Sequence, residues 1–526
     1  MRGEMAEVDT PTPEAEDVVE PGSRGWRPQL ASNVGVTPGR TRSTSTDVNS
    51  RFSCALDPSA ATALPHVWEH TVGSGHATLA LRADWQRQLT RCHRELGFRH
   101  VRFHGLLSDD MGTLVNEDNS LVYSFFNADQ ICDFLLSIGM RPFVELSFMP
   151  TALASKDDEV FHYRGNVTPP KDYRGWETLV TKLVRHWMDR YGPDEVRRWY
   201  FEVWNEPNLK AFWTGRKDAY FRLYQHTARA IKGVDGELAV GGPATAKNAW
   251  IGDFVEFCEE NGVPIDFIST HHYPTDAFGK PGDDTVSQLA QSRRSVLREQ
   301  ATKARSEAGH KPLYYTEWST SSNPFDELHD WPYAAAFIVK AEMEVRNLVQ
   351  GYSYWTFSDI FEENYFASRA FHGGFGLLTI DGVPKPAYRA FELLHRLGDQ
   401  IHAVEGEHPT VDVWVTSENR RVTVLVTNGA LPRHPIRREL VVLELRGARG
   451  AQSAFVERID DDHANPRRAW LEMGLPERPL PRQVAELESA SALIRTPVSA
   501  RRGADGLVFE LDVPPQGTVL LTVELS

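Results

Sequence analysis

Apolar residues recur along the middle of this chain with two alternating periods. Between residues 173 and 191 they fall at spacings of three and four, and Gly192 follows, so this segment is predicted to be an amphipathic helix that ends at the glycine. Short runs of apolar, β-branched and aromatic residues separate this helix from other segments of the same kind. Between about residues 60 and 400 the pattern predicts strands and helices in strict alternation.

Eight helices and eight strands are expected in this region. The helices are expected at residues 82–96, 127–138, 173–191, 217–234, 248–260, 286–308, 331–349 and 386–397. The strands are expected at residues 67–72, 101–104, 142–148, 199–205, 238–242, 267–271, 313–317 and 352–357. Alternation indicates parallel strands joined by crossover helices, and eight units favour an α/β fold of the closed (β/α)8 type, a TIM barrel. A doubly wound open sheet is the alternative.

The two ends of the chain have a different character. Residues 1–50 lack periodicity and are rich in Pro, Thr, Ser and Glu, so we predict a disordered N-terminal tail. We expect the barrel to span residues 60–400 and residues 401–526 to form a β-sandwich accessory domain with a helical insert at about 466–490. Its antiparallel strands are expected at residues 411–415, 421–427, 440–445, 507–513 and 519–523.

Composition and charge argue against several classes of protein. An apolar content of 41% and an aromatic content of 10% are typical of globular proteins. The net charge of −15 disfavours nucleic acid as a partner, because phosphate binding needs a basic face. No apolar run reaches the roughly 20 residues of a membrane span, and the acidic start does not resemble a signal peptide. We therefore expect a cytoplasmic protein without a membrane partner; a homo-oligomer is compatible with the sequence.

The residue types that bind metals are not clustered in the sequence. The four cysteines are scattered without CxxC spacing, which indicates buried free thiols rather than a zinc site or a disulfide framework. The adjacent residues His271 and His272 could suggest a metal site, but neighbours on a strand point to opposite faces. No third ligand is evident, so neither a metal nor a cofactor is expected.

Two segments place a glutamate at the carboxyl end of an expected strand. Residues 200–209 (YFEVWNEPNL) end the fourth strand with Glu206, and residues 313–319 (LYYTEWS) end the seventh with Glu317. Retaining glycoside hydrolysis needs two carboxyl groups about 5–5.5 Å apart, one as nucleophile and one as acid. The negative charge of the nucleophile would raise the pKa of the acid. Each glutamate alone could be a structural ion pair, but the two motifs together favour the catalytic interpretation.

Further motifs carry a resemblance to a known family. They are VGSGH at 72–76, VRFHG at 101–105, STHHY at 269–273, YWTFSDIFEE at 354–363 and FHGGFG at 371–376. With the two glutamate motifs, they resemble family 39 of the glycoside hydrolases, and within it the bacterial β-xylosidases. The resemblance covers about residues 60–400 and continues into the C-terminal β region. It implies an exo-acting enzyme that releases terminal β-D-xylosyl residues from short xylo-oligosaccharides or aryl glycosides by double displacement.

The resemblance also implies roles for individual side chains. Glu206 would be the acid/base, Glu317 the nucleophile, and Asn205 the partner of the sugar 2-hydroxyl, while Arg102 would hold the charge of the nucleophile. Aromatic rings suit the C–H faces of a sugar, and carboxylates accept hydrogen bonds from vicinal hydroxyls. The other implied pocket residues are His104, Phe212, His271, Tyr273, Trp355, Glu362 and Glu363.

The sugar preference is less constrained than the chemistry. Relatives tend to carry a tyrosine a few residues after the nucleophile, where this chain has residues 319–324 (STSSNP). An arabinopyranoside or an iduronide is the alternative glycone, although Glu362 and Glu363 would repel the carboxylate of a uronic acid. An inactive sugar-binding protein is a further alternative, against which both carboxylates and Asn205 argue. The C-terminal domain could be an independent sugar-binding module, but structural support of the barrel is favoured.

Overall fold

Eight parallel strands form a closed barrel in the computed structural model, which describes residues 50–118, 120–276, 284–363 and 369–526. The barrel strands are β3 (Thr71–His76), β4 (His100–His104), β7 (Arg141–Leu146), β10 (Tyr200–Val203), β11 (Ala239–Thr245), β12 (Phe267–His272), β13 (Leu313–Trp318) and β14 (Gly351–Tyr354). Their spatial order is β3-β4-β7-β10-β11-β12-β13-β14, and β14 pairs with β3 to close the ring. The TIM barrel expected from the sequence is confirmed, and the open-sheet alternative is wrong.

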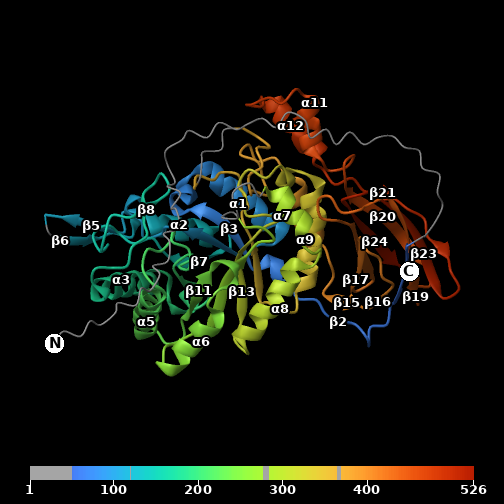
Figure 1. Ribbon diagram of the computed structural model, residues 1–526. Helices are drawn as coiled ribbons and strands as arrows, with labels where there is room; N and C mark the ends of the chain where they lie inside the picture. Colours follow the sequence, from blue (N-terminus) through green and yellow to red (C-terminus); the bar gives the residue numbers. More distant parts are fainter. Residues whose placement is uncertain (1–49, 119, 277–283, 364–368) are drawn as a thin grey trace, which may run out of the picture. The chain divides into compact units, whose positions relative to one another are not determined.

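Helices follow the barrel strands in the expected alternation (Figure 1). They are α1 (Ala83–Leu96), α2 (Phe126–Ser137), α3 (Tyr173–Tyr191), α4 (Pro193–Val196), α5 (Lys217–Val234), α6 (Ile251–Glu260), α7 (Thr285–Gln291), α8 (Val296–Ala308), α9 (Pro332–Val345) and α10 (Pro386–His395). Helix α3 matches its expected range, its apolar stripe is buried, and Gly192 ends it with φ +83. Short hairpins lie in two loops: β5 (Leu114–Glu117) with β6 (Ser120–Tyr123), and β8 (Glu159–Val160) with β9 (Gly165–Asn166).

Two elements of the barrel region differ from the sequence-based expectation, and strand β20 (Ala451–Ile459) of the C-terminal region was not expected. The first strand was expected at 67–72 but begins at Thr71, because residues 67–69 form the 3-10 helix η1 (Val67–Glu69). Val67 and Trp68 are buried in the helical turn, and a short apolar run does not by itself distinguish a helical turn from a strand. The helix expected at 286–308 is divided into α7 and α8, with Ser292 ending α7 in an extended conformation.

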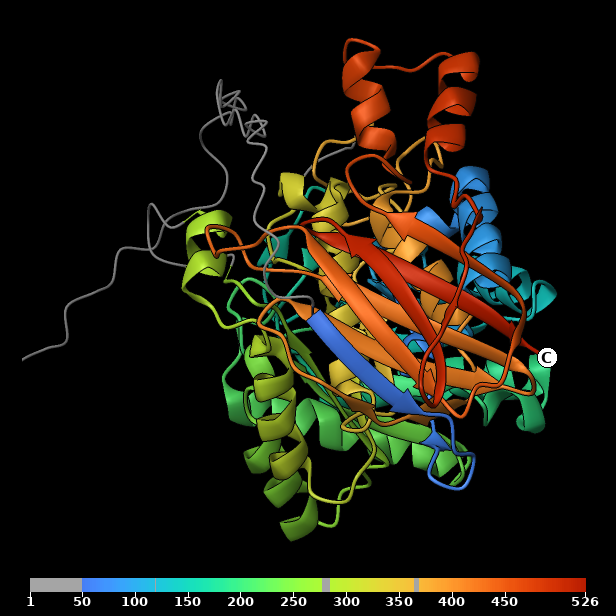
Figure 2. The same ribbon diagram turned by 90° about the vertical axis from the view of Figure 1, so that its right-hand side faces the viewer.

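The C-terminal region forms two facing sheets around one apolar core (Figure 2). One sheet has the order β2 (Thr62–Ala63), β15 (Gln400–His402), β17 (Val411–Glu418), β18 (Arg421–Asn428), β24 (Gly517–Leu525), β20 (Ala451–Ile459) and β21 (Thr496–Pro497). The other has the order β16 (Val404–Glu405), β1 (Ser50–Ala55), β19 (Glu439–Arg446), β23 (Gly506–Val513) and β22 (Arg501–Arg502). The expected sandwich is confirmed.

One strand of the sandwich comes from before the barrel. Strand β1 pairs in parallel with β19, the one parallel pair recorded in the two sandwich sheets of the described chain, and appears as the blue strand among the orange and red ones in Figure 2. It places Phe52 and Cys54 in the sandwich core. The sequence did not indicate this partner, because the alternation within β1 contains no information on which distant strand it joins. The predicted tail at 1–50 otherwise lies outside the described residues.

The sandwich contacts the barrel through side chains of both polarities. Helix α9 packs on β18 and β24, and Asp412 of β17 pairs with Arg294 and, at 3.2 Å, with Lys340 Nζ. The insert expected at 466–490 consists of α11 (Pro466–Glu472) and α12 (Pro481–Ala490). Its Trp470 shares an apolar cluster with Phe371, which follows β14. The described residues therefore belong to one compact unit.

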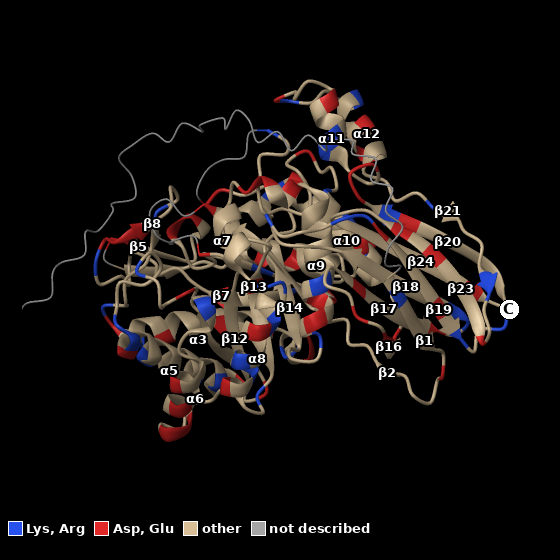
Figure 3. Ribbon diagram, turned by 45° about the vertical axis from the view of Figure 1, so that its right-hand side comes forward, with Lys and Arg blue, Asp and Glu red and all other residues tan. Residues whose placement is uncertain are grey.

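Other properties inferred from composition have structural counterparts. The four cysteines are free and buried: Cys54, Cys92, Cys132 and Cys258. Within the described ranges, every helix is too short or too polar to cross a membrane. Acidic and basic residues are interspersed along the helices around the barrel (Figure 3).

Glu342 is a buried carboxyl group on α9, among mostly apolar residues of that helix. Its side chain is inaccessible, and neither of its oxygens has a hydrogen-bond partner among the described residues. Burial raises the pKa of Glu342 well above its usual range. The folded protein therefore holds a proton on Glu342 at pH values where the unfolded chain has released it, so this group lowers stability as the pH rises above the unfolded value.

We expect the E342Q variant to lose this pH dependence. The neutral amide resembles the protonated acid, so the two proteins should have similar unfolding free energies near about pH 5, and the variant should be more stable near about pH 8. The difference should grow by up to about 1.4 kcal/mol per pH unit between the two pKa values of Glu342. Denaturant unfolding at both pH values measures it, with E256Q on the exposed face of α6 as the control. A pH-independent difference would contradict this assignment.

Candidate active site

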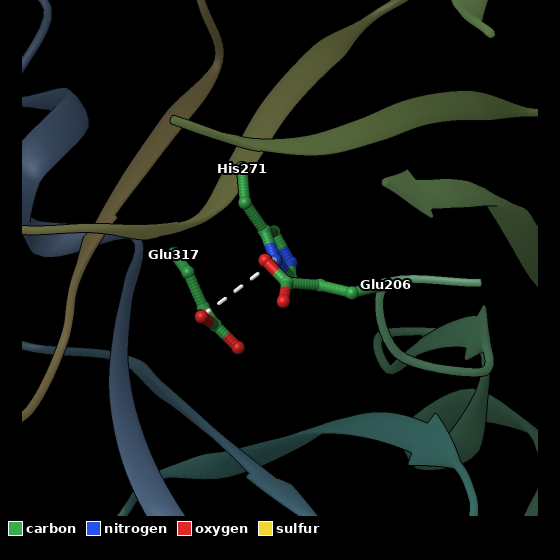
Figure 4. Close-up of side chains that lie close together, drawn as sticks. All are labelled: Glu206, His271 and Glu317. Atoms are coloured by element: carbon green, nitrogen blue, oxygen red, sulfur yellow. Dashed lines mark hydrogen bonds and ion pairs between the residues drawn. The ribbon is translucent and has the colours of Figure 1, made fainter. Parts of the chain in front are cut away.

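Two glutamates from different strands face each other at the carboxyl end of the barrel. Glu206 follows β10, and Glu317 lies near the end of β13. One carboxylate oxygen of each, together with a ring nitrogen of His271, lies within 4.8 Å of the others (Figure 4). Retaining glycoside hydrolases have their two carboxyl groups about 5–5.5 Å apart. The pair is therefore spaced for attack on one bond from one side and protonation from the other.

The backbone after β10 is bent sharply to present Glu206. Trp204 has φ +71 and Glu206 has φ +43, both in the left-handed region that side chains with a Cβ rarely adopt. Surrounding bonds hold this conformation: the Glu206 N–H donates to Ala244 O at 2.8 Å, and Trp204 Nε1 donates to Phe212 O at 2.7 Å. Backbone strain of this kind is concentrated at functional sites.

Arg102 on β4 has a fully buried guanidinium that binds several polar residues of the site. Its Nη1 donates to Glu317 Oε1 at 2.7 Å, and its Nε donates to Glu202 Oε2 at 2.5 Å. Its Nη2 donates to Asn205 Oδ1 at 3.0 Å and lies 2.8 Å from Glu145 Oε2. Because Asn205 Oδ1 accepts from Arg102, the NH2 group of the amide is the part that can donate to a ligand. Burial would lower the pKa of Arg102, but the three carboxylates raise it.

His104 supplies a second positive charge beside the nucleophile. Its Nδ1 lies 2.6 Å from Glu145 Oε2, and its Nε2 lies 3.4 Å from oxygens of both Glu317 and Glu363. Burial would lower the pKa of His104, but these carboxylates raise it to about 9. The imidazole is therefore a cation at neutral pH, with a proton on each nitrogen.

The two catalytic candidates differ in their surroundings. Burial and the nearby charge of Glu317 raise the pKa of Glu206 well above its usual range, in spite of the opposing charges of His104 and Arg102. Glu317 instead receives hydrogen bonds from Arg102 and, at 3.1 Å, from the Tyr273 hydroxyl. The arrangement raises the pKa of Glu206 and orients Glu317 through two donors, as an acid and a nucleophile require.

His271 lies between the acid and the barrel wall. Its Nδ1 lies 3.0 Å from Glu206 Oε1, and its Nε2 lies 3.1 Å from Thr316 Oγ1. Burial, followed by the charge of Arg102, lowers the pKa of His271 well below its usual range, so the ring is neutral. His272 points to the other face of β12, where its Nε2 lies 2.6 Å from the Tyr352 hydroxyl.

The two aromatic residues expected to form walls of the pocket both pack against other rings. Trp355 is 3% exposed, and its ring centroid lies 4.8 Å from that of His104. A Cβ at Gly73 would lie 2.6 Å from Trp355 Cε3, so the absence of a side chain there admits the indole. Phe212 stacks on Phe148 with a centroid distance of 6.4 Å and an interplanar angle of 2°.

The adjacent acids Glu362 and Glu363 have different environments. Glu363 is buried beside His104, and burial raises its pKa to about 7. Glu362 lies 3.2 Å from His76 Nδ1, and although burial opposes it, this histidine lowers the pKa of Glu362. His76 in turn stacks on Tyr163, with ring centroids 3.7 Å apart. In the part of the chain that the structure describes, Glu363 contacts His104 beside the nucleophile, whereas Glu362 contacts His76.

The segment after the nucleophile is buried and bonded within itself. Ser319, Thr320 and Ser321 are inaccessible, and Ser321 Oγ donates to Asp326 Oδ2 at 2.6 Å. Residues 319–324 contain no tyrosine, although the family resemblance leads us to expect one here. In this chain the phenol that reaches Glu317 belongs to Tyr273.

The structure places His271 beside Glu206 and Glu317 rather than beside a second histidine ligand. Among the described residues, Glu206, His271 and Glu317 are the group close enough to hold an ion. Arg102 and His104 already place two positive charges next to Glu317. Electrostatic repulsion from them opposes binding of a cation, so the group is better suited to proton transfer.

Sequence reasoning missed three buried polar residues of the site. Glu145 and Glu202 bind Arg102, and Thr316 connects Glu202 to His271. A signal was available, because Glu145 and Glu202 stand inside otherwise apolar strands. A charged residue in such a position is almost never fully buried unless it is paired.

A glutamate with a raised pKa, facing a second glutamate held by two donors at the mouth of a TIM barrel, is the arrangement of a glycoside hydrolase of the retaining type. Residues 56–506 match the family model described as Glycosyl hydrolases family 39, and the chain belongs to this family.

Similar proteins include two β-xylosidases. That of Caldicellulosiruptor saccharolyticus is 50% identical over 463 residues, which cover 87% of this chain and 95% of that protein. That of Geobacillus stearothermophilus is 38% identical over 463 residues, which cover 84% and 89% of the two chains. The crystal structure of a monomeric β-xylosidase from Caulobacter crescentus CB15 aligns with a TM-score of 0.80 at 31% identity, covering 90% of this chain and 99% of that one.

Proposed function

We propose that this chain is a β-xylosidase that removes single β-D-xylosyl residues from the non-reducing ends of xylo-oligosaccharides, with retention of configuration. The observation that carries the proposal is the approach of Glu206 and Glu317 to within 4.8 Å in a chain 50% identical to a β-xylosidase. The proposal includes a cytoplasmic location, supported by four buried free thiols, which are typical of a reducing compartment. Xylan would then reach the enzyme only as small imported fragments.

In the proposed reaction, the two carboxyl groups act in sequence. Glu317 attacks the anomeric carbon while Glu206 gives its proton to the departing glycosidic oxygen, which forms a glycosyl ester on Glu317. Glu206 then takes a proton from a water molecule that attacks the same carbon and frees the sugar. Arg102 and Tyr273 donate hydrogen bonds to Glu317, so they orient the nucleophile. They also stabilise the carboxylate that forms again when the ester is hydrolysed.

The neighbouring side chains are proposed to hold the sugar. The Asn205 amide donates to the 2-hydroxyl, a contact that strengthens in the transition state. Trp355 and Phe212 offer apolar faces for the sugar ring, and His104 and Glu363 offer a donor and an acceptor for hydroxyl groups. His271 and Tyr273 line the pocket while they contact the two catalytic carboxyls. Glu362, bound to His76, is proposed to act at the rim.

Product analysis with xylotriose tests this proposal. Proton NMR should show β-xylose first, with xylobiose as the other initial product, and kinetics on a panel of nitrophenyl glycosides should favour the β-D-xyloside. Initial release of α-xylose would contradict the retaining mechanism. Turnover of an iduronide or an arabinopyranoside but not the xyloside would mean that the glycone is not xylose. The buried Glu363 beside the nucleophile disfavours a uronic acid, because it would face the carboxylate of that sugar.

The pKa of Glu363 predicts a pH-dependent KM. Below its pKa of about 7 the side chain is a neutral acid, and above it a carboxylate that accepts hydrogen bonds from two hydroxyls. We therefore expect KM for the xyloside to fall as the pH rises through about 7. In E363Q this step should disappear and KM should rise about 10-fold or more, as expected for loss of a charged hydrogen bond. The neighbouring variant E362Q should keep the step, and its loss there would reassign the titration.

A further inference from the structure

A chain of hydrogen bonds joins Glu202 to Glu206 through two side chains. Thr316 Oγ1 donates to Glu202 Oε1 at 2.7 Å and lies 3.1 Å from His271 Nε2, while His271 Nδ1 lies 3.0 Å from Glu206 Oε1. All four residues are buried. The geometry points to Thr316 and Glu202 as positioning residues that hold the proton of His271 on Nε2, so that the ring turns a lone pair toward Glu206. This inference rests on the acid/base role proposed for Glu206.

The direction of each bond follows from the available protons. Glu202 accepts from Arg102 Nε at 2.5 Å on its other oxygen, so both of its oxygens act as acceptors; burial raises the pKa of Glu202 in spite of the opposing charge of Arg102. Thr316 has one hydroxyl proton and gives it to Glu202, so its oxygen is left to accept from His271 Nε2. A neutral imidazole carries a single N–H. His271 Nδ1 is therefore an acceptor.

A lone pair beside Glu206 supports both halves of the reaction. The protonated carboxyl can donate to His271 Nδ1, whereas the carboxylate finds no donor there, so the tautomer favours the acid form in the free enzyme. In the first step the proton moves to the glycosidic oxygen as the C–O bond breaks, and the leaving group departs as an alcohol. The resulting carboxylate is a stronger base for lack of a donor, and it recovers a proton from the attacking water as the glycosyl ester is cleaved.

Other charged and titratable groups face the same pair from each neighbouring strand. They are Arg102 and His104 on β4, Glu145 on β7, Tyr273 after β12, Glu317 on β13 and Glu363 after β14, while His272 acts on His271 from the opposite face of β12. Their charges act on Glu206 whichever nitrogen of His271 is protonated. Thr316, in contrast, decides which nitrogen carries the proton.

The T316V variant tests this role through the pH profile of kcat/KM. Without the acceptor at Nε2, the imidazole proton is free to occupy Nδ1 and donate to the Glu206 carboxylate, which stabilises the ionised form. We expect the alkaline limb of the profile to move down by about one pH unit, the effect of one hydrogen bond to a charged group. T316S, which keeps the hydroxyl, should restore the limb to the parent pH. T270V is the matched control, because it removes a buried hydroxyl of the residue next to His271 that is not part of the chain of hydrogen bonds from Glu202 to Glu206.

Nitrogen-15 NMR of histidine-labelled protein provides a readout that does not depend on turnover. The parent should show His271 as the Nε2–H tautomer, and T316V should shift it toward Nδ1–H. An Nδ1–H tautomer in the parent, or an alkaline limb that moves equally in T270V and T316V, would overturn the inference. Absence of xyloside hydrolysis in the parent would instead count against the proposed function. The tautomer measurement would still test whether Thr316 holds the proton of His271 on Nε2.

Discussion

The E317Q variant is expected to hydrolyse 4-nitrophenyl β-D-xyloside with a kcat lower than that of the parent by about 10⁴-fold or more. The amide is nearly isosteric with the carboxylate but cannot form the glycosyl ester, so the double displacement has no first step. Arg102 retains its contacts with Glu202 and Glu145, and therefore the buried guanidinium is not left unpaired in the variant. Steady-state kinetics with equal concentrations of folded enzyme measures the loss.

Two further measurements separate loss of chemistry from loss of structure. The unfolding midpoint of E317Q should remain close to that of the parent, and xylose should still bind, because the substitution leaves Trp355 and Phe212, the proposed walls of the pocket, unchanged. The exposed-surface variant E256Q should retain the parent kcat. Activity of E317Q within about 10-fold of the parent would mean that another group is the nucleophile.

Replacement of the acid should have an effect that depends on the leaving group. In E206A, kcat/KM for xylobiose should fall by about 10²- to 10⁴-fold, the usual contribution of general acid catalysis, because an alcohol of high pKa needs a proton to depart. A 2,4-dinitrophenyl xyloside needs no such help, so its kcat/KM should change by less than about 10-fold. Its kcat should nevertheless fall, because no base activates water in the second step. Kinetics of both substrates on the same preparation measures the contrast.

Azide provides a check on the second step. A small anion can occupy the space left by the missing side chain and attack the glycosyl ester without a base, so azide should raise kcat of E206A on the activated substrate and give a β-glycosyl azide. Equal losses of kcat/KM on xylobiose and on the dinitrophenyl xyloside would contradict the assignment of Glu206 as the acid.

Local periodicity was sufficient for most of the fold because it reports directly on burial. Helix α3 was predicted to the residue, and the barrel strands were found in order, because each buries an apolar stripe or run that the sequence displays. This reasoning was inaccurate where local periodicity does not specify the structure. Residues 67–69 are apolar but form a helical turn, and β1 joins a sheet whose other strands lie more than 300 residues further along the chain.

By itself, the sequence determined the barrel, the sandwich and the two strand ends that carry Glu206 and Glu317. These follow from periodicity and from short motifs, which act over a few neighbouring residues. Only the tertiary structure decided which charges each side chain meets. It raises the pKa of Glu206 and of His104, gives Glu362 and Glu363 different partners, and brings Thr316 to His271. Protonation and hydrogen-bond direction depend on burial and on groups brought close in space, and chain order does not specify these distances.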